Sequence, residues 1–413
     1  MTPTGAIPRE IIRLRRPALI AALAGTVLML VWLTFSREQF FRGYLVAWMF
    51  VLGISLGSLA IVMLSHLVGG EWSWLVRRLG EAAACNLIAT AVLFIPILFG
   101  LPYLFPWADP HQVALTPILQ HKALYLNKTW FLIRAIIYFA IWISLALSLR
   151  RLSRQHDRTA DNMPLARAQR ISAAGLVLIV ITMTLASVDW ILSRDPHWFS
   201  TVIGLLVVVG QAASGMAFLV FMLMRIAGRD PIVPVLERKH MIDLGNLLLT
   251  LVILWAYLSF AQFLIIWMGN TKEDINFYVE RGMGVVSNGW KWLALLLIVF
   301  HFFVPFFILL SRDSKMRERV LLTIAALLLA MRWLDLVWMI TPTGHRNFTG
   351  VELCATLAIG GIWLMTFIGQ LEGIPLLPIH APLAPAGSDE HGHADASHSS
   401  EPPANEKGNL IGG

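Results

Sequence analysis

Cysteine is nearly absent from this sequence, and charged residues are scarce. Only two cysteines occur in 413 residues, and Asp, Glu, Lys and Arg together supply 14% of the chain. Cys85 and Cys354 stand far apart and belong to no CxxC or Cys/His cluster of the kind that holds zinc or an iron–sulfur cluster. They are therefore interpreted as small apolar helix residues. Nucleotide-binding loops and the HExxH motif are missing as well.

Hydrophobic residues, in contrast, make up 57% of the chain, and the mean hydropathy is +0.69. A water-soluble protein of this composition would precipitate. A helix needs about 20 apolar residues to cross a hydrocarbon layer ~30 Å thick, because it rises about 1.5 Å per residue. Ten runs have this length: 17–35, 43–68, 82–104, 129–149, 170–192, 199–224, 242–268, 290–310, 318–341 and 351–371. The sequence thus predicts an all-α polytopic membrane protein with ten transmembrane helices.

The net charge of +7 is distributed unevenly between the two expected membrane faces. With a cytoplasmic N-terminus, 21 of the 32 Lys and Arg residues fall on the cytoplasmic side and eight on the other. This bias follows the positive-inside rule and predicts that both termini are cytoplasmic. The positive net charge is therefore explained by membrane orientation and does not indicate nucleic-acid binding. Tryptophans at the ends of the spans suggest an aromatic belt. They are Trp130, Trp190, Trp198, Trp267, Trp290, Trp292 and Trp338 outside, and Trp72 and Trp74 inside.

Three regions are expected along the chain. Residues 1–16 form a cytoplasmic segment, and the apolar run after RLRRP is too long for a signal peptide, so it is expected to remain as a span. Residues 17–371 form the ten-helix membrane domain. Residues 372–413, rich in Pro, Ala, Ser, Gly and His, are expected to be a disordered cytoplasmic tail. The long outer loops 105–128 and 269–289 suit either docking to another protein or simple solvation.

Small residues mark candidate helix contacts, because they let helix backbones approach closely in lipid. Gly53 and Gly57 form a GxxxG pattern, and Gly210, Ser214 and Gly215 follow a similar pattern in the sixth span. A secondary transporter would be expected to have interrupted helices at matched positions in two halves. Pro96 and Pro305 are not obviously matched, and most spans are unbroken, so the pattern favours a static scaffold.

The stretch AMRWLDLVWMITP (330–342) places two full charges inside an apolar run. A charged side chain near the bilayer centre costs about 2.5–3.5 kcal/mol on insertion scales, so such groups usually face a bundle interior. Arg332 and Asp335 lie three residues apart and therefore share a helix face, which allows a mutual ion pair. One interpretation is that this pair is purely structural.

The other interpretation is that Asp335 belongs to a proton path. Asp335 and Asp189 fall in the outer thirds of their spans, His301 lies near the midplane, and Asp243 and His66 lie toward the cytoplasm. Proton relays are built from such Asp and His series. The order in depth is suggestive, but the sequence does not show which helix faces meet, so both interpretations stay open.

A haem held by two histidines within the membrane requires both histidines to lie at a similar depth in their spans. Only His66 and His301 lie within spans, and they differ in depth by roughly 18 Å at 1.5 Å per residue. The sequence therefore predicts that this chain binds no haem or other cofactor of its own.

Several stretches resemble one known family. They are EWSWLVRRLGEAA (71–83), HKALYLNKTWFLIR (121–134), SVDWILSRDPHWFSTVIG (187–204), HMIDLGNLLLTLVILWAYLSFAQFLIIWMGN (240–270), FFVPFFILLSRDSK (302–315) and RWLDLVWMITP (332–342). Together they resemble the second NrfD-like membrane subunit, the ActF type, of bacterial alternative complex III, within the NrfD and polysulfide-reductase superfamily. The resemblance covers about 65–375. In DLGNLLLTL the family usually has Lys where Asn246 stands.

The resemblance implies two four-helix bundles plus two peripheral helices in the bacterial inner membrane. It also implies membership of a respiratory complex that oxidises quinol and reduces cytochrome c or an oxidase. The implied partners are a periplasmic iron–sulfur subunit, c-type cytochrome subunits, a paralogous NrfD-like subunit with the better-supported quinol site, and a haem–copper oxidase as alternative acceptor. Quinol, haem c and iron–sulfur clusters would then be held by the partners.

Two other functions remain open from the sequence. The chain could itself be a quinol-oxidising anchor of the NrfD type, with Asp189 or Asp335 accepting a proton near the periplasmic side. No His occurs in the outer half of a span, which weakens that alternative. A secondary transporter is the third hypothesis, and uptake into proteoliposomes would distinguish it.

Overall fold

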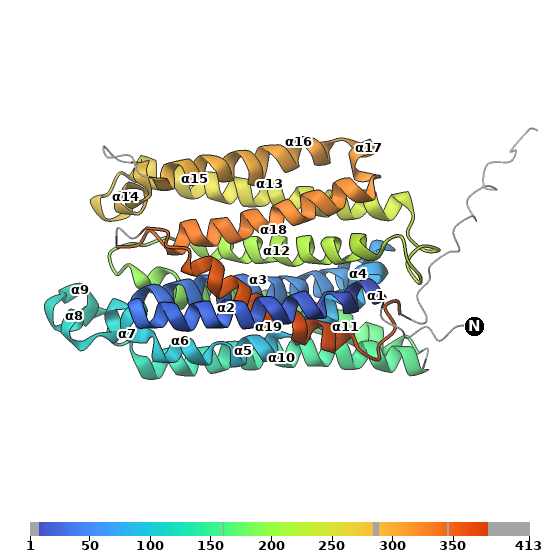
Figure 1. The fold of residues 1–413 in the computed structure, drawn as a ribbon, viewed down its shortest axis with the longest axis horizontal. Coiled ribbons are helices and arrows are strands. Elements are labelled where there is room, and N and C mark those ends of the chain that lie inside the picture. The colour runs from blue at the N-terminus through green and yellow to red at the C-terminus, as the bar shows by residue number, and fades with distance from the viewer. Residues whose placement is uncertain (1–7, 160, 284–288, 345–346, 379–413) are drawn as a thin grey trace, which may run out of the picture.

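The computed structural model describes residues 8–159, 161–283, 289–344 and 347–378, and all regular elements in these ranges are helices. Within these ranges, ten helices are long and apolar enough to cross a membrane. Figure 1 shows them lying side by side along one common direction. The prediction of an all-α polytopic membrane protein with ten spans is confirmed.

The first four-helix bundle contains the second to fifth spans. Its members are α3 (Arg37–Val68), the segmented span α4 (Trp72–Cys85), α5 (Leu87–Val92), α6 (Ile95–Phe99) and α7 (Leu101–Leu104), and then α10 (Lys128–Thr159) and α11 (Met163–Trp190). Helix α3 packs on α4 and α11, and α10 packs on α11 and α4. An aromatic core around Trp48, Trp142 and Trp190, all fully buried, fills this bundle.

The second four-helix bundle contains the sixth to ninth spans. Its members are α12 (Ile203–Ile226), α13 (Arg238–Gly269), the span α15 (Gly289–Leu297), η4 (Ile298–Phe303) and α16 (Val304–Leu310), and then α18 (Glu318–Ile340). Helix α12 packs on α18 and α13, and α16 packs on α13.

The two bundles meet where α3 crosses α12. A Cβ atom at Gly57 would lie 1.8 Å from the carbonyl oxygen of Gln211, and one at Gly215 would lie 2.3 Å from the backbone of Gly57. No side chain fits there, so the small residues predicted for helix contact hold the bundles together. Gly210, on the same stretch of α12, has a different neighbour that is described below.

The first and tenth spans, α2 (Arg15–Phe35) and α19 (Val351–Leu371), lie outside both bundles and pack on each other and on α3. Their contact also depends on glycine. A Cβ atom at Gly25 would come within 2.3 Å of the Ala358 nitrogen, and one at Gly361 would come within 2.6 Å of the Ala22 nitrogen. The arrangement of two four-helix bundles plus two peripheral helices is therefore observed.

The described chain begins and ends at one end of the molecule, called here the terminal face, on which α1 (Arg9–Arg13) and α17 (Arg312–Lys315) also lie (Figure 1). Arg15 and Glu372 join the two chain ends there through a salt bridge of 3.1 Å. The opposite end, called the loop face, carries η1 (Pro106–Ala108), α8 (Pro110–Leu115), α9 (Pro117–His121), η2 (Leu192–Arg194), α14 (Lys272–Tyr278) and η3 (Val279–Met283).

Of the residues expected in the tail, the structure describes 372–378. Leu376 is only 4% exposed, whereas Glu372 and Gly373 are exposed. The remainder of the expected tail, 379–413, and the first seven residues of the expected N-terminal segment lie outside the described residues.

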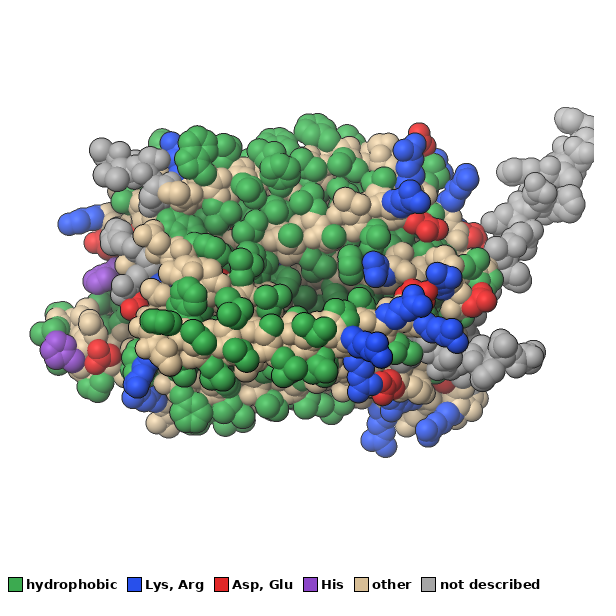
Figure 2. Space-filling view, viewed as in Figure 1, with side chains coloured by type: hydrophobic (Ala, Val, Ile, Leu, Met, Phe, Trp, Pro, Cys, Tyr) green, Lys and Arg blue, Asp and Glu red, His purple; other side chains and the backbone are tan. Residues whose placement is uncertain are grey.

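The surface agrees with a lipid environment. In Figure 2, apolar side chains cover the flank between the two ends, and Lys and Arg side chains gather toward the terminal face. The aromatic belt is only partly observed. Trp130, Trp267 and Trp292 are at least half exposed, whereas four others expected in the belt are buried in the protein: Trp72, Trp190, Trp198 and Trp290.

Two spans are irregular, although the sequence suggested mostly unbroken helices. The third span is divided into α4, with 14 residues, and three short helices, and Pro96 and Pro102 each stand near the start of one of the short ones. The eighth span contains a π-helical turn, η4, which ends at Phe303, two residues before Pro305. Proline lacks a backbone N–H, so a helix must widen or break near it.

Candidate functional site

Each four-helix bundle holds one buried acidic residue near the loop face, and each acid has an arginine partner. In the second bundle, the partners are Asp335 and Arg332, which are 3% and 1% exposed. Arg332 Nη1 donates to Asp335 Oδ2, as the i, i+3 spacing on α18 allowed. Because both groups are removed from water, their attraction offsets a large cost of desolvation.

Asp335 has a second partner on a neighbouring helix. The indole Nε1 of Trp255, on α13, donates to Asp335 Oδ2 over 3.2 Å. The ring of Trp255 also lies against the ring of His301, with 3.9 Å between the ring centroids and 30° between the ring planes. These contacts join α18, α13 and the eighth span into one polar cluster inside an otherwise apolar bundle. We call Arg332, Asp335, Trp255 and His301 the bundle-two cluster.

His301 is the unusual member of this cluster. It is fully buried, and neither Nδ1 nor Nε2 has a hydrogen-bond partner among the described residues. It lies inside the π-turn η4, four residues before Pro305. Since Pro305 cannot donate to the His301 carbonyl, the helix widens here, and such π-turns are frequent at functional sites.

Arg332 fits into the bundle because of a glycine on α12. A Cβ atom at Gly210 would lie 2.2 Å from Arg332 Nη2 and 2.4 Å from Cζ. The guanidinium therefore rests on bare helix backbone. Its Nε atom is buried and has no hydrogen-bond partner among the described residues. Three buried nitrogens of the bundle-two cluster, His301 Nδ1 and Nε2 and Arg332 Nε, thus have no hydrogen-bond partner among the described residues. Ordered water commonly fills this role at buried polar groups.

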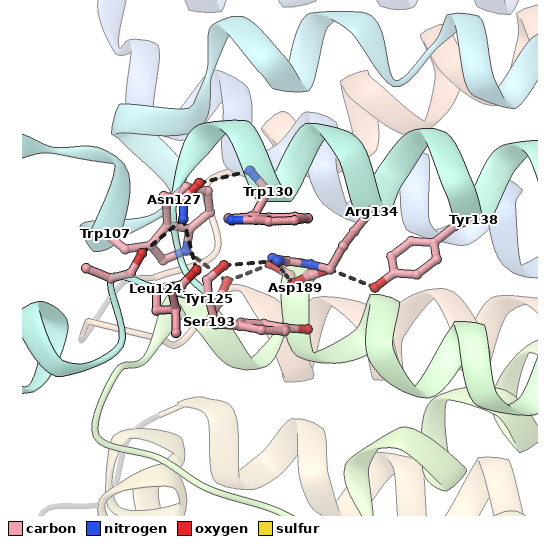
Figure 3. Close-up of polar contacts among 10 residues, drawn as sticks. Trp107, Leu124, Tyr125, Asn127, Trp130, Arg134, Tyr138, Asp189 and Ser193 are labelled. Carbon is pink, nitrogen blue, oxygen red and sulfur yellow. Dashed lines mark hydrogen bonds and ion pairs between the residues drawn. The ribbon is translucent and has the colours of Figure 1, made fainter.

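In the first bundle, Asp189 is held much more completely (Figure 3). Arg134 of α10 binds it with two parallel hydrogen bonds, Nε to Oδ2 at 2.9 Å and Nη2 to Oδ1 at 2.7 Å. The hydroxyl of Tyr138 donates to Oδ2 at 3.0 Å. Such two-point pairing of guanidinium and carboxylate is the strong form of this interaction. Asp189 itself has no solvent exposure.

The same arginine fastens the loop face to the bundle. Arg134 Nη1 donates to the backbone carbonyl of Tyr125 at 2.9 Å, and the guanidinium lies 3.8 Å above the Tyr125 ring. Nearby, the Ser193 hydroxyl donates to the Asp189 carbonyl and accepts from Trp107 Nε1 (Figure 3). Burial raises the pKa of the Tyr125 hydroxyl, which therefore stays protonated at neutral pH. We call Asp189, Arg134, Tyr138 and Tyr125 the bundle-one cluster.

The remaining residues of the expected proton path lie apart from both clusters. Asp243 is an exposed residue near the terminal-face end of α13. His66, at the corresponding end of α3, is partly buried, and its Nε2 has no hydrogen-bond partner among the described residues. Of the five predicted residues, only Asp335 and His301 are brought together, with Trp255 between them.

Buried arginines also organise the loop-face end of α18. Arg281 donates to the carbonyls of Trp338 and Met339, and Arg194 donates to the carbonyl of Ile340. These are carbonyls of the last helical turn, which have no partner within the helix itself. Burial lowers the pKa of Arg281 to about 9, so the guanidinium remains charged at neutral pH.

At the terminal face, Asn246 has a cationic neighbour. Lys315 of α17 is buried, donates from Nζ to Asn246 Oδ1, and packs its side-chain stem against Gly245. Burial lowers the pKa of Lys315. Asn246 on α13 is thus linked to a buried cation that another helix contributes.

No group of three or more His, Cys, Asp or Glu is placed to hold a metal ion in the described ranges. His301 is enclosed against Trp255, and His66 lies near the other end of the membrane domain, so the two do not face each other. Cys85 and Cys354 are both free.

Sequence reasoning missed Trp255, Tyr138 and Gly210 as parts of these clusters. Tyr138 follows Arg134 by four residues and so shares its helix face, a spacing that the sequence does show. Trp255 and Gly210 reach the second cluster from other helices, and no local pattern marks them.

No family model and no curated protein matches the chain.

Proposed function

We propose that this chain is an integral membrane subunit of a bacterial respiratory quinol:cytochrome c, or quinol:oxidase, oxidoreductase of the alternative complex III type. The observation that carries the proposal is the architecture. Two four-helix bundles and two peripheral helices, with both described chain ends at one face, match what the sequence resemblance implies. The positive charge at the terminal face favours a cytoplasmic location for that face.

In this proposal the chain is a scaffold, and its redox partners supply the electron carriers. The partners are a periplasmic iron–sulfur subunit, c-type cytochrome subunits, a paralogous quinol-binding membrane subunit and a haem–copper oxidase as alternative acceptor. Quinol, haem c and iron–sulfur clusters belong to them. The helical loop face, with η1, α8, α9 and α14, is the surface on which periplasmic partners would dock.

The bundle-two cluster is the place where the chain would contribute to proton transfer. Asp335 and His301 are both buried titratable groups, and the Trp255 ring lies between them. An indole does not relay protons, so the path needs water. The unpartnered nitrogens of His301 and Arg332 are suitable hydrogen-bond partners for such water.

Asp189 has a different part in the proposal. Three hydrogen bonds from Arg134 and Tyr138 occupy its carboxylate. These bonds fix the carboxylate in place, and the same guanidinium donates to the Tyr125 carbonyl of the loop face. We therefore assign Asp189 to anchoring the loop face, and we restrict the proton-transfer proposal to Asp335 and His301, with Asp243 and His66 at the cytoplasmic end.

The quinol-oxidising alternative has less support. It needs a slot for a quinone beside a proton acceptor. The two described cavities are lined by other residues, and neither Asp189 nor Asp335 is among them.

The decisive experiment is purification of the affinity-tagged chain from its native membrane. We expect co-purification of c-type cytochrome and iron–sulfur subunits with quinol:cytochrome c activity. After the partners are stripped away, the isolated chain should show no Soret band and no stoichiometric iron. Purification of a homogeneous, partner-free chain with transport activity in proteoliposomes would contradict the proposal, and so would a persistent haem spectrum.

A further inference from the structure

A cavity of about 710 Å³ opens at the loop face, where the first span turns into the second. It is lined by Leu33, Thr34, Phe35, Ser36, Arg37, Phe41, Phe99 and Tyr103. The cavity belongs to neither cluster, and the proposed function does not use it. Its size is in the usual range of small-molecule sites.

The walls of the cavity are graded from apolar to polar. Leu33 precedes the turn at Ser36, and Phe99 precedes Tyr103 on the third span, so the apolar walls lie deeper in the membrane. Ser36, Arg37 and the Tyr103 hydroxyl lie toward the interface. Phe35 and Phe99 are 81% and 75% exposed, which opens the cavity sideways to the surrounding lipid.

The polar end of the cavity carries a cation. Arg37 Nη1 donates to the Tyr103 hydroxyl oxygen at 3.3 Å, which leaves the other guanidinium N–H groups and the hydroxyl proton available for an anion. Arg37 is also the first residue of α3, a helix of 32 residues, whose N-terminal end favours negative charge. The neighbouring acid, Glu38, does not line the cavity and interacts instead with Arg194.

The aromatic wall is set by a glycine. The ring of Phe41 stacks on Tyr103, with 5.6 Å between centroids and 11° between planes. A Cβ atom at Gly100 would lie 2.3 Å from Phe41 Cδ1. The absence of a side chain at position 100 therefore allows the flat wall of the cavity.

We propose that this cavity binds one phospholipid of the adjoining leaflet, with its phosphate on Arg37 and Tyr103 and an acyl chain along Phe35, Phe41 and Phe99. Arginine presents a planar set of donors that matches a phosphate. The exposed apolar walls supply a surface that only a lipid tail or a similar chain would cover within the membrane. This inference is independent of the proposed respiratory function.

The test uses the purified chain, with any subunits that accompany it, in nanodiscs containing phosphatidylglycerol with a photoreactive acyl chain. We expect labelling of residues 33–41 and 95–104 after irradiation and digestion. Arg37→Gln should lower this labelling about tenfold, as expected for loss of one charge-assisted contact. Gly100→Ala should also lower it, because the added methyl group displaces the Phe41 ring while the charge remains.

Lys291→Gln is the matched control, since Lys291 is an exposed cation at the loop-face end of another span and lines neither described cavity. Its labelling should equal that of the wild type. Thermal unfolding of each variant shows that the fold is intact. Equal labelling in Arg37→Gln and the wild type would overturn the proposal. Recovery of an isoprenoid quinone in place of phospholipid from the washed wild-type protein would overturn it too.

Discussion

The guanidinium of Arg332, on α18, lies directly against the backbone of α12 at Gly210, where a Cβ atom would come within 2.2 Å of Nη2. The same guanidinium forms the ion pair with Asp335, so it cannot move away from α12 without weakening that pair. Arg332 can therefore be buried in this bundle only because α12 has glycine at the facing position, 210.

Gly210→Ala is the first prediction. The added methyl group would push the guanidinium off Asp335 or separate α12 from α18, and we expect a loss of about 1–3 kcal/mol of stability. Thermal unfolding of the detergent-solubilised protein measures it. Gly360→Ala in α19 is the control, since no atom lies within 4 Å of its built Cβ and alanine is the better helix former. Equal stability of the two variants would contradict the tight fit.

The second prediction concerns the charge pair itself. Asp335→Asn keeps an acceptor for Trp255 but leaves Arg332 charged and unpaired in a buried site. Removing one partner of a buried pair costs about 3–5 kcal/mol, so this variant should assemble poorly. Adding Arg332→Met removes the stranded charge and should restore assembly, as judged by the yield of folded complex.

The restored double variant then separates a structural pair from a proton path. If Asp335 carries protons, the assembled double variant should oxidise quinol but move fewer protons per electron, because no titratable group remains at that position. The proton-to-electron ratio in proteoliposomes gives the answer. An unchanged ratio would remove Asp335 from the proton path and leave the pair as a purely structural element.

The third prediction concerns Asp189 and Arg134. Arg134→Lys keeps the charge but loses the two-point pairing and the contact with the Tyr125 carbonyl. We expect faster proteolysis of the loop between α7 and α10, with quinol oxidation and proton movement changed much less. Tyr138→Phe, which loses one hydrogen bond to Asp189 and leaves the Tyr125 contact, is the milder comparison. Loop protection that does not differ between these variants and the wild type would argue against the anchoring role.

The sequence was sufficient for features that depend on one helix at a time. The ten spans follow from apolar run length, and the contact of Arg332 with Asp335 follows from their i, i+3 spacing. Arg134 and Asp189 are 55 residues apart on different helices, so their pairing depends on packing that no local pattern shows. Trp190 was assigned to an interfacial belt because it ends a span. It is buried instead because its side chain points into the bundle, against Trp48 and Trp142.

The fourth prediction concerns Asn246 and its hydrogen-bond partner Lys315. The Oδ1 atom of Asn246 accepts a hydrogen bond from Nζ of the buried Lys315. Asn246→Lys removes the acceptor and places a second ammonium group beside a buried one. We expect a loss of about 1–2 kcal/mol, the cost of leaving a buried donor without its partner. Asn276→Lys, at an exposed position of α14, changes the net charge equally and should be neutral.

Lys315→Gln in the same chain should rescue Asn246→Lys, because the glutamine carbonyl can accept from the new ammonium group. A double-mutant cycle on thermal stability measures this coupling. The pH dependence gives a second readout. Burial lowers the pKa of Lys315 in the folded protein below the value of 10.5 that it has in the unfolded chain. As pH rises, the folded protein therefore loses this proton at a lower pH than the unfolded chain does. The free energy of unfolding should increase between the lowered pKa and pH 10.5. The rise should disappear in Lys315→Gln, and a rise of equal size in both proteins would show that another group causes it.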